Sequence, residues 1–281
     1  GSSYNACLLA SYWIEKVAKI PTVCSNSSEF RYREPIIEDG TLIIPVSQSG
    51  ETADTLSASH LMKQSGYDQL SIVNTKNTEL ERITSNSIYM RANKEIGVAS
   101  TKAFTTQLVT LACLSVALAR AKGNIDTIRE AELTHALAEI PARAAGVLAH
   151  DERIRGLANS LTQSTTIIYI GRGSGYPVAM EGALKLKEIS YIHAEGYRAG
   201  EMKHGPLALI EDGMPVVVLA PRDEYFKKTI SNMQEVIARG AKVLLITNKN
   251  KDEVVHENIW QSIQVENTND DLLPFLITIP L

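Results

Sequence analysis

The chain has 281 residues, of which 44% are hydrophobic and 21% charged, and its formal net charge is -4. This length and composition exclude a disordered chain and a small disulfide-stapled module, and of the one or two domains that they allow we expect two. A slightly acidic chain has no general attraction to nucleic acid or to an anionic membrane, so neither is an expected partner.

The cysteines and the apolar runs narrow the class of protein further. Cys7, Cys24 and Cys113 form no CxxC pair, so the sequence predicts neither a disulfide framework nor a zinc site. No charged-then-apolar leader opens the chain, and the longest apolar stretch, residues 108–119, is too short and too polar for a membrane span. The expected location is the cytoplasm.

Apolar, β-rich runs alternate with amphipathic stretches along the chain, which is typical of an α/β fold with parallel sheets. In chain order the first half predicts a helix at 4–18, a strand at 22–24, a helix at 28–33, a strand at 42–47, a helix at 52–65, strands at 69–74 and 87–90, and a long helix at 101–121. A helical linker region follows at 125–162, and then come a strand at 166–171, a helix at 177–189, and strands at 215–220 and 242–247. We therefore expect two doubly wound, flavodoxin-like subdomains, 1–140 and 141–281, related by internal duplication.

Three hydroxyl side chains gather where the predicted strand 42–47 meets the next helix. The segment reads Ser47-Gln48-Ser49-Gly50-Glu51-Thr52. A turn there presents unpaired backbone N–H groups and the positive end of the helix dipole, so it can hold a phosphate with little help from Lys or Arg. Simple capping of the helix by Ser49 and Thr52 is the alternative. The segment lacks the spacing of a nucleotide or dinucleotide loop, which favours a monophosphate.

A second glycine-rich turn follows the predicted strand 166–171. It reads Gly171-Arg172-Gly173-Ser174-Gly175. Such a turn resembles a phosphate loop, but a glycine turn between a strand and a helix is often only a matter of tight geometry. Both interpretations stay open for this segment.

Ionisable side chains cluster in the second half. Glu181, Lys185 and Glu188 are spaced four and three residues apart, which places them on one helix face. A solvated stripe of ion pairs is the alternative, but apolar neighbours on several sides favour a cleft. His204 lies in a turn where its side chain can exchange protons with a sugar. The alternative is a histidine that is only a surface or hydrogen-bonded residue. No residue set has metal-ligand spacing, so we predict no metal and no cofactor.

Segments 47–55, 95–102 and 181–206 together resemble one family. They are similar to the pair of sugar-isomerase (SIS) domains of glucosamine-6-phosphate synthase, and the likeness runs over nearly the whole chain. The resemblance implies two SIS-type halves that convert fructose 6-phosphate to glucosamine 6-phosphate in the cytoplasm, in an enzyme that forms a homodimer.

The resemblance also implies a role for individual residues. At the phosphate and the sugar it places Ser3, Ser47, Gln48, Ser49, Thr52 and Val98. It makes Glu188 the base that moves a proton between C1 and C2, with Lys185 as a polar partner on the same helix. His204 becomes the ring-opening residue, donated across a dimer interface. These roles agree with the chemistry, because a keto–aldo shift needs an oriented phosphate, a base and a proton shuttle.

Both ends of the chain look truncated, since residues 1–3 resemble a turn entering a helix and residues 274–281 break off inside an apolar run. We therefore expect a fragment of a longer protein. In the family a glutaminase domain precedes this region and a C-terminal tail carries a Schiff-base lysine, so sugar-phosphate binding is expected to survive better than catalysis. Two alternatives are a non-catalytic sugar-phosphate sensor and a plain aldose–ketose phosphate isomerase.

Overall fold

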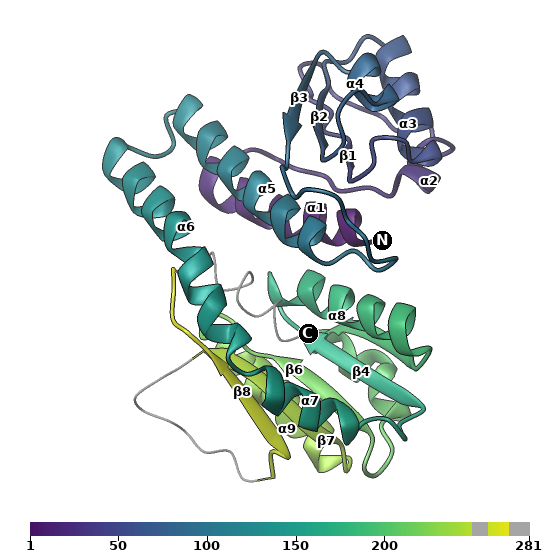
Figure 1. The fold of residues 1–281 in the computed structure, drawn as a ribbon, viewed down its shortest axis with the longest axis vertical. Helices are drawn as coiled ribbons and strands as arrows, with labels where there is room; N and C mark the ends of the chain where they lie inside the picture. Colours follow the sequence, from purple (N-terminus) through teal and green to yellow (C-terminus); the bar gives the residue numbers. More distant parts are fainter. Residues whose placement is uncertain (249–257, 270–281) are drawn as a thin grey trace. The chain divides into compact units, whose positions relative to one another are not determined.

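The computed structural model describes residues 1–248 and 258–269. The chain divides into two compact units, Gly1–Asn124 and Ile125–Leu281, which are described separately below (Figure 1). Each unit is built on a parallel sheet covered by helices, so the predicted α/β class is confirmed. The expected subdomain boundary, between residues 140 and 141, lies inside the helix α6 (Thr127–Leu148). The division into 1–140 and 141–281 stays a prediction.

Unit 1 carries a three-stranded sheet in the sequential order β1-β2-β3. The strands are β1 (Val46–Ser47), β2 (Leu70–Val73) and β3 (Asn86–Tyr89). Because consecutive parallel strands need a crossover, helix α3 (Ala53–Gln64) joins the first pair and α4 (Glu79–Ile83) joins the second. The short helix α2 (Ser27–Phe30) packs against α3.

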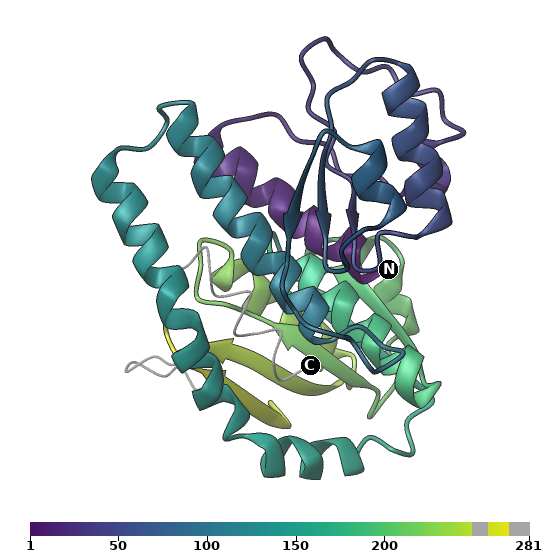
Figure 2. The same cartoon turned by 45° about the horizontal axis from the view of Figure 1, so that its top comes forward.

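Two long helices complete unit 1. Helix α1 (Ser2–Trp13) contacts β1 and runs alongside α5 (Lys102–Ala121), as Figures 1 and 2 show. By length and composition α5 could cross a membrane, which corrects the expectation from the sequence, and no other helix in the described ranges meets this test. Half of that stretch is buried, and buried core helices of soluble proteins pass the same test, so the signal is weak.

The predicted strand 42–47 is largely irregular, and only β1 remains of it. An isolated bridge pairs Ile43 with Gln69. Between that bridge and β1 lies Pro45, which has no N–H and so cannot complete a ladder. Its carbonyl oxygen still accepts a hydrogen bond from the N–H of Ile72 at 3.0 Å, which keeps the segment beside the sheet.

The start of the chain differs from the prediction in two further ways. The predicted helix 4–18 is α1 followed by a separate π-helical turn, η1 (Ile14–Ala18). The predicted strand 22–24 is irregular. The N–H of Thr22 donates to the carboxylate of Glu15 at 3.3 Å instead of to a strand. Residues 22–24 are of types that favour strands, but within the described ranges they pair with no neighbouring strand and therefore form a loop.

Unit 2 carries a five-stranded parallel sheet in the order β5-β4-β6-β7-β8. The strands are β4 (Thr166–Gly171), β5 (His193–Arg198), β6 (Pro215–Leu219), β7 (Lys242–Asn248) and β8 (Gln261–Val265). From β4 the chain moves one way to β5 and the other way to β6 and beyond. This is the flavodoxin-type order, and it places a topological switch point between β4 and β6. Every residue of β6 is buried.

Helices cover both faces of the sheet in unit 2. Helix α8 (Gly175–Ser190) joins β4 to β5, and α9 (Phe226–Ala238) joins β6 to β7. Because these crossovers run in opposite directions and parallel crossovers are right-handed, the two helices lie on opposite faces. Between β5 and β6 come two short 3-10 helices, η2 (Ala199–His204) and η3 (Pro206–Leu209).

Two helices fill the predicted helical region 125–162. They are α6, whose first turn is capped by the carboxylate of Asp126, and α7 (Asp151–Asn159). The N–H of Arg129 donates to that carboxylate at 2.8 Å, an ordinary N-cap bond. This part of the prediction is confirmed. Strands β5 and β8 and helix α9 were not predicted from the sequence.

Candidate functional site

The turn between β1 and α3 forms a compact hydroxyl-lined cradle, defined here as residues 47–52. The hydroxyl oxygens of Ser47 and Thr52 lie 3.0 Å apart, and the N–H of Gly50 donates to Ser47 Oγ at 3.1 Å. Gly50 has a φ of 69°, which favours glycine. Thr52 stands at the N-cap of α3, and within the described ranges its side chain forms no capping hydrogen bond. The first-turn N–H groups of α3 thus stay available to an anion.

The other two predicted residues of the cradle are half-buried. The carbonyl oxygen of Gln48 accepts hydrogen bonds from the N–H groups of Asn74 at 3.1 Å and Thr75 at 3.4 Å, which holds the turn against the end of β2. Ser49 Oγ accepts a hydrogen bond from the N–H of Glu51 at 3.2 Å. Neither Ser49 nor Thr52 caps α3, so the capping alternative does not explain this cluster of hydroxyls.

The N-terminal end of α4 braces the cradle. The N–H of Glu79 donates to Glu51 Oε1 at 2.8 Å, and the N–H of Leu80 donates to the carbonyl oxygen of Gly50 at 3.2 Å. Thr78 packs so closely that a Cβ added to Gly50 would lie 2.4 Å from Thr78 Oγ1. A glycine at position 50 is therefore required both by the positive φ and by this contact.

Two carboxylates, one within the cradle and one just after it, have partners of their own. Glu51 is bound by the backbone of α4, and Asp54, in the first turn of α3, accepts a hydrogen bond from Arg31 Nη1 at 3.0 Å. An unpaired carboxylate at a helix N-terminus would repel a bound anion. Because both are engaged, the cradle keeps its positive helix end for another negative group.

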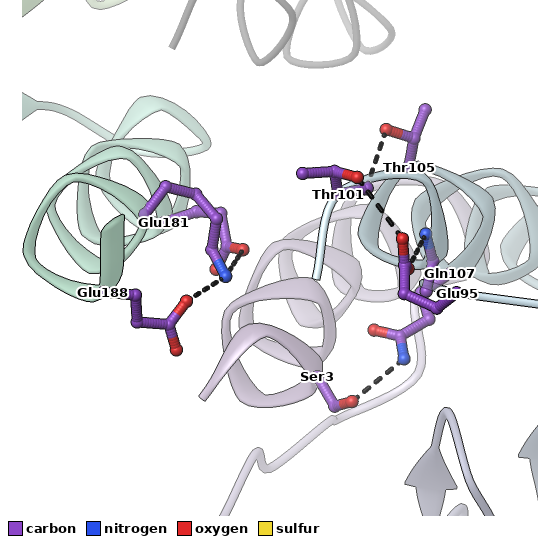
Figure 3. A network of polar contacts seen from close by, with 9 residues as sticks. Ser3, Glu95, Thr101, Thr105, Gln107, Glu181 and Glu188 are labelled. Carbon is purple, nitrogen blue, oxygen red and sulfur yellow. Dashed lines mark hydrogen bonds and ion pairs between the residues drawn. The ribbon is translucent and has the colours of Figure 1, made fainter. Parts of the chain in front are cut away.

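Ser3 lies in the first turn of α1, and its hydroxyl meets α5 (Figure 3). Gln107 Nε2 donates to Ser3 Oγ at 2.9 Å. Val98 lies on the loop that precedes α5 and is fully exposed. Glu95 closes this loop, since its carboxylate accepts hydrogen bonds from the N–H of Ala103 at 2.9 Å and from Thr101 Oγ1 at 3.3 Å. Ser3 on α1 and Val98 on the loop before α5 therefore lie on different elements of unit 1, and both are outside the cradle.

In unit 2 the structure brings Lys185 and Glu188 together on α8. Figure 3 labels Glu188 and Glu181 on this helix. Lys185 Nζ lies 2.5 Å from Glu188 Oε2 and 3.6 Å from Glu181 Oε1. The side chains of Lys185 and Glu181 are only 11% and 3% exposed, whereas that of Glu188 is 37% exposed. A solvated stripe is therefore excluded for the first two. The arrangement is a buried ammonium that holds one carboxylate at the surface.

His204 ends the helix η2 and is exposed. The next residue, Gly205, has a φ of 133° and turns the chain sharply. In the part of unit 2 that the structure describes, no hydrogen bond or ion pair joins His204 to Lys185 or Glu188. The imidazole is presented outward, and its predicted role in ring opening stays a prediction.

The second glycine-rich turn, residues 171–175, is closed. The N–H of Gly175 donates to the carbonyl oxygen of Arg172 at 2.8 Å, so the turn satisfies part of its own backbone. Gly173 has a φ of 49°, and a Cβ there would lie 2.7 Å from the Tyr225 ring. The guanidinium of Arg172 donates to Asn232 Oδ1 at 3.1 Å. The tight-geometry interpretation fits this turn better than a phosphate loop.

Four residues that support the candidate site were not predicted from the sequence to have a role in it: Glu51, Thr78, Glu95 and Gln107. The Thr78 pattern was readable, because Thr78-x-x-Glu81 is a capping box and the structure forms it. Within the described ranges, no group of three His, Cys, Asp or Glu side chains could hold a metal ion.

Comparisons with known sequences identify the family of the chain. The model of the SIS domain family matches residues 1–117 and 160–281. The chain is 46% identical over 281 residues to the glutamine–fructose-6-phosphate aminotransferase (isomerizing) of Zymomonas mobilis and 46% identical to that of Brucella abortus. Both matches cover 100% of this chain and 46% of the relative. The chain thus spans about half the length of the curated relatives that it matches.

Solved structures agree with the sequence relatives. The C-terminal domain of glucosamine-fructose-6-phosphate aminotransferase from Francisella tularensis matches with a TM-score of 0.97 at 45% identity, covering 100% of this chain and 79% of that one. Glucosamine-6-phosphate deaminase from Thermotoga maritima matches with a TM-score of 0.77 at 24% identity, over 100% of this chain and 80% of that one, which shows a shared fold alone. The chain therefore belongs to the SIS domain family, alongside the C-terminal domains of glutamine–fructose-6-phosphate aminotransferases.

Proposed function

We propose that this chain is the sugar-phosphate isomerase part of a glutamine–fructose-6-phosphate aminotransferase, which converts fructose 6-phosphate and ammonia to glucosamine 6-phosphate. The observation that carries this proposal is the match of the whole chain, at 46% identity, to relatives of that name. The cradle geometry supports the phosphate half of the proposal, and the Lys185–Glu188 pair supports the proton-transfer half.

In this proposal the cradle binds the phosphate of the substrate. The hydroxyls of Ser47, Ser49 and Thr52, the Gln48 side chain and the first-turn N–H groups of α3 all supply hydrogen-bond donors. Hydrogen bonds to a charged group contribute about 1.5–3 kcal/mol each, so a few of them account for micromolar binding. Ser3 and Val98 contact the rest of the sugar.

In the same proposal the residues of unit 2 move protons. Glu188 acts as the base that transfers a proton between C1 and C2 of the open-chain sugar. The Lys185 ammonium, 2.5 Å away, orients that carboxylate and is itself steadied by Glu181. His204 donates or accepts the proton that opens the sugar ring. We propose no metal or organic cofactor.

The wider setting is also proposed from the relatives. A glutaminase domain of the longer enzyme releases ammonia from glutamine, the protein forms a homodimer in which His204 serves the partner's substrate, and the enzyme works in the cytoplasm. Analytical ultracentrifugation of this chain tests the dimer, because a single species of monomer mass over a wide concentration range would oppose it.

Binding is the first test, by calorimetric titration with fructose 6-phosphate, glucosamine 6-phosphate, inorganic phosphate and unphosphorylated glucosamine. We expect both sugar phosphates to bind and glucosamine not to. The Ser49→Ala variant removes one donor and should weaken binding by about tenfold or more. Ser174→Ala, in the closed second turn, is the matched control and should bind like the parent. Equal binding of glucosamine would refute the phosphate assignment.

Catalysis is tested by following solvent deuterium entering C1 of fructose 6-phosphate by NMR. Exchange should occur with the parent chain and fall by about two orders of magnitude or more in Glu188→Gln, as for loss of a general base. Sugar-phosphate binding should persist in that variant. Binding without any exchange, both in the parent chain and in a longer chain that carries the C-terminal tail of the family, would favour the non-catalytic sensor over the isomerase.

A further inference from the structure

Gln107 is a buried polar residue that the proposed function leaves without a role. It lies on the same face of α5 as Ala103 and Leu111, and its exposure is 1%. Burying an amide is unfavourable unless its polar atoms are hydrogen-bonded. Nε2 donates to Ser3 Oγ at 2.9 Å, but within the described ranges Oε1 has no hydrogen-bond partner. Packing alone does not explain why a glutamine occupies this position.

The single bond of Gln107 determines how the Ser3 hydroxyl can be used. A serine hydroxyl has one hydrogen to donate and two lone pairs that accept. Because the Gln107 amide donates, it occupies an acceptor position of Ser3 Oγ and leaves the hydroxyl hydrogen for another partner. The Ser3 hydroxyl is thereby set as a donor.

The surroundings of Ser3 suit an oxygen-rich, anionic ligand. Ser3 is half-buried in the first turn of α1, and no side chain caps this turn within the described residues. The first N–H groups of a helix have no intrahelical acceptors and carry the positive end of the helix dipole. A donor hydroxyl beside such a helix end complements a phosphate or sugar oxygen.

Replacements at position 107 would change this polarity in known ways. An ionised glutamate would present only acceptor oxygens to Ser3 and turn the hydroxyl hydrogen inward, away from a ligand. A methionine of similar length would leave the hydroxyl free to rotate. Among these three side chains, only the amide both fills the space and donates to Ser3 Oγ.

We propose that Gln107 is a positioning residue that sets the Ser3 hydroxyl as a hydrogen-bond donor to the sugar phosphate. This inference rests on the proposed function, since it requires that Ser3 contacts that ligand. Gln107 itself acts through Ser3 and does not touch the ligand.

A double-mutant cycle tests the inference, with glucosamine 6-phosphate as the calorimetric probe. Ser3→Ala should weaken binding by about tenfold, the effect of one hydrogen bond to a charged group. Gln107→Met and Gln107→Glu should also weaken it, with the larger effect in Gln107→Glu. The double variant Ser3→Ala/Gln107→Met should bind like Ser3→Ala alone, because Gln107 has no other route to the ligand.

The melting temperature separates positioning from a structural role. Gln107→Met removes an unpartnered buried acceptor, so its melting temperature should not fall while its affinity does. Multiplicative effects in the double variant, or unchanged affinity in Gln107→Met or Ser3→Ala, would overturn the inference and leave the proposed function standing. Failure of the parent chain to bind glucosamine 6-phosphate would overturn both.

Discussion

The molecule contains two strand–turn–helix loops that share a local geometry but differ in how open they are to a ligand. Each follows a parallel strand, β1 or β4, and each contains a glycine with a positive φ, Gly50 or Gly173. In the first loop Thr78 packs closely against Gly50, and the hydroxyl groups of the cradle and the N-terminal end of α3 stay available to a ligand. In the second loop the ring of Tyr225 lies against the glycine, and the turn bonds to its own backbone.

This difference teaches that loop geometry alone does not make a binding site. In unit 2 the second turn lies at the switch point between β4 and β6, where ligands usually bind in open α/β sheets. Tyr225 follows β6 and therefore covers that position. In unit 1 the cradle follows β1, at the edge of a sequential sheet, and its neighbour α4 braces the turn without covering it. The covering residue distinguishes the two loops more clearly than the glycine does.

The largest expected effect comes from Gly50→Ala, which breaks the first loop. Its Cβ would meet Thr78 Oγ1 at 2.4 Å in a backbone conformation with a φ of 69°. We expect a loss of more than about 2 kcal/mol in the free energy of unfolding, together with loss of sugar-phosphate binding. Urea unfolding measures the first and calorimetry the second.

Gly66→Ala is the matched control for that variant. Gly66 has a φ of 83°, but a Cβ there would meet nothing within 4 Å. Only the backbone penalty of about 1 kcal/mol applies, and binding should be retained. Equal destabilisation in the two variants would show that the contact with Thr78 is unimportant.

A smaller effect is expected from Gly173→Ala in the second loop. The nearest atom to its Cβ is Tyr225 Cε2 at 2.7 Å, the edge of a side chain that can move aside. We expect a loss of about 1–2 kcal/mol in stability and no change in sugar-phosphate affinity. In a Tyr225→Ala background the same substitution should cost less, because the steric contact is gone. Additive losses in the double variant, or weaker sugar-phosphate binding, would contradict this account.

Glu51→Ala separates bracing of the cradle from its hydroxyl chemistry. The variant loses the carboxylate that accepts from the N–H of Glu79 at 2.8 Å. Loss of such a cap costs about 0.5–2 kcal/mol, and the looser cradle should bind sugar phosphate several-fold more weakly. Glu38→Ala is the control, because its side chain forms no hydrogen bond in the described ranges. If the two variants bind alike, α4 does not brace the cradle.

The smallest effect is a difference in thiol reactivity, and it reports on unit 1 alone, since all three cysteines lie there. A hydrogen bond from the Cys7 thiol lowers the pKa of Cys24, and the same bond, together with burial, raises the pKa of Cys7. Desolvation raises the pKa of Cys113. Thiolate is the reactive form, so as pH rises Cys24 should be alkylated first.

Mass spectrometry after iodoacetamide treatment over a pH series measures that order. In Cys7→Ser the hydrogen bond to Cys24 weakens or changes, so the onset of Cys24 alkylation should move to a different pH. Faster alkylation of Cys113 than of Cys24 near neutral pH would contradict the assigned shifts.

Several parts of the fold were readable from the sequence because they depend on local pattern. The strands near residues 69–74 and 166–171 are buried apolar runs, and the cradle is a dense group of hydroxyls around one glycine. Helix α9 was missed although its buried Ile230, Met233 and Val236 recur at helical spacing. By contrast β5 and β8 are edge strands rich in polar residues, so their sequences carry no clear alternation.

The sequence by itself therefore determined the α/β class, the family and the residue types of the cradle and of the Glu181–Lys185–Glu188 face, since each depends on residues close together in the chain. Tertiary structure alone decided that Tyr225 closes the second turn and that Thr78 braces the first. It also decided that Gln107 donates to Ser3, which lies 104 residues away in the chain. Contacts between distant segments depend on how helices pack onto the sheets, and no local periodicity encodes that packing.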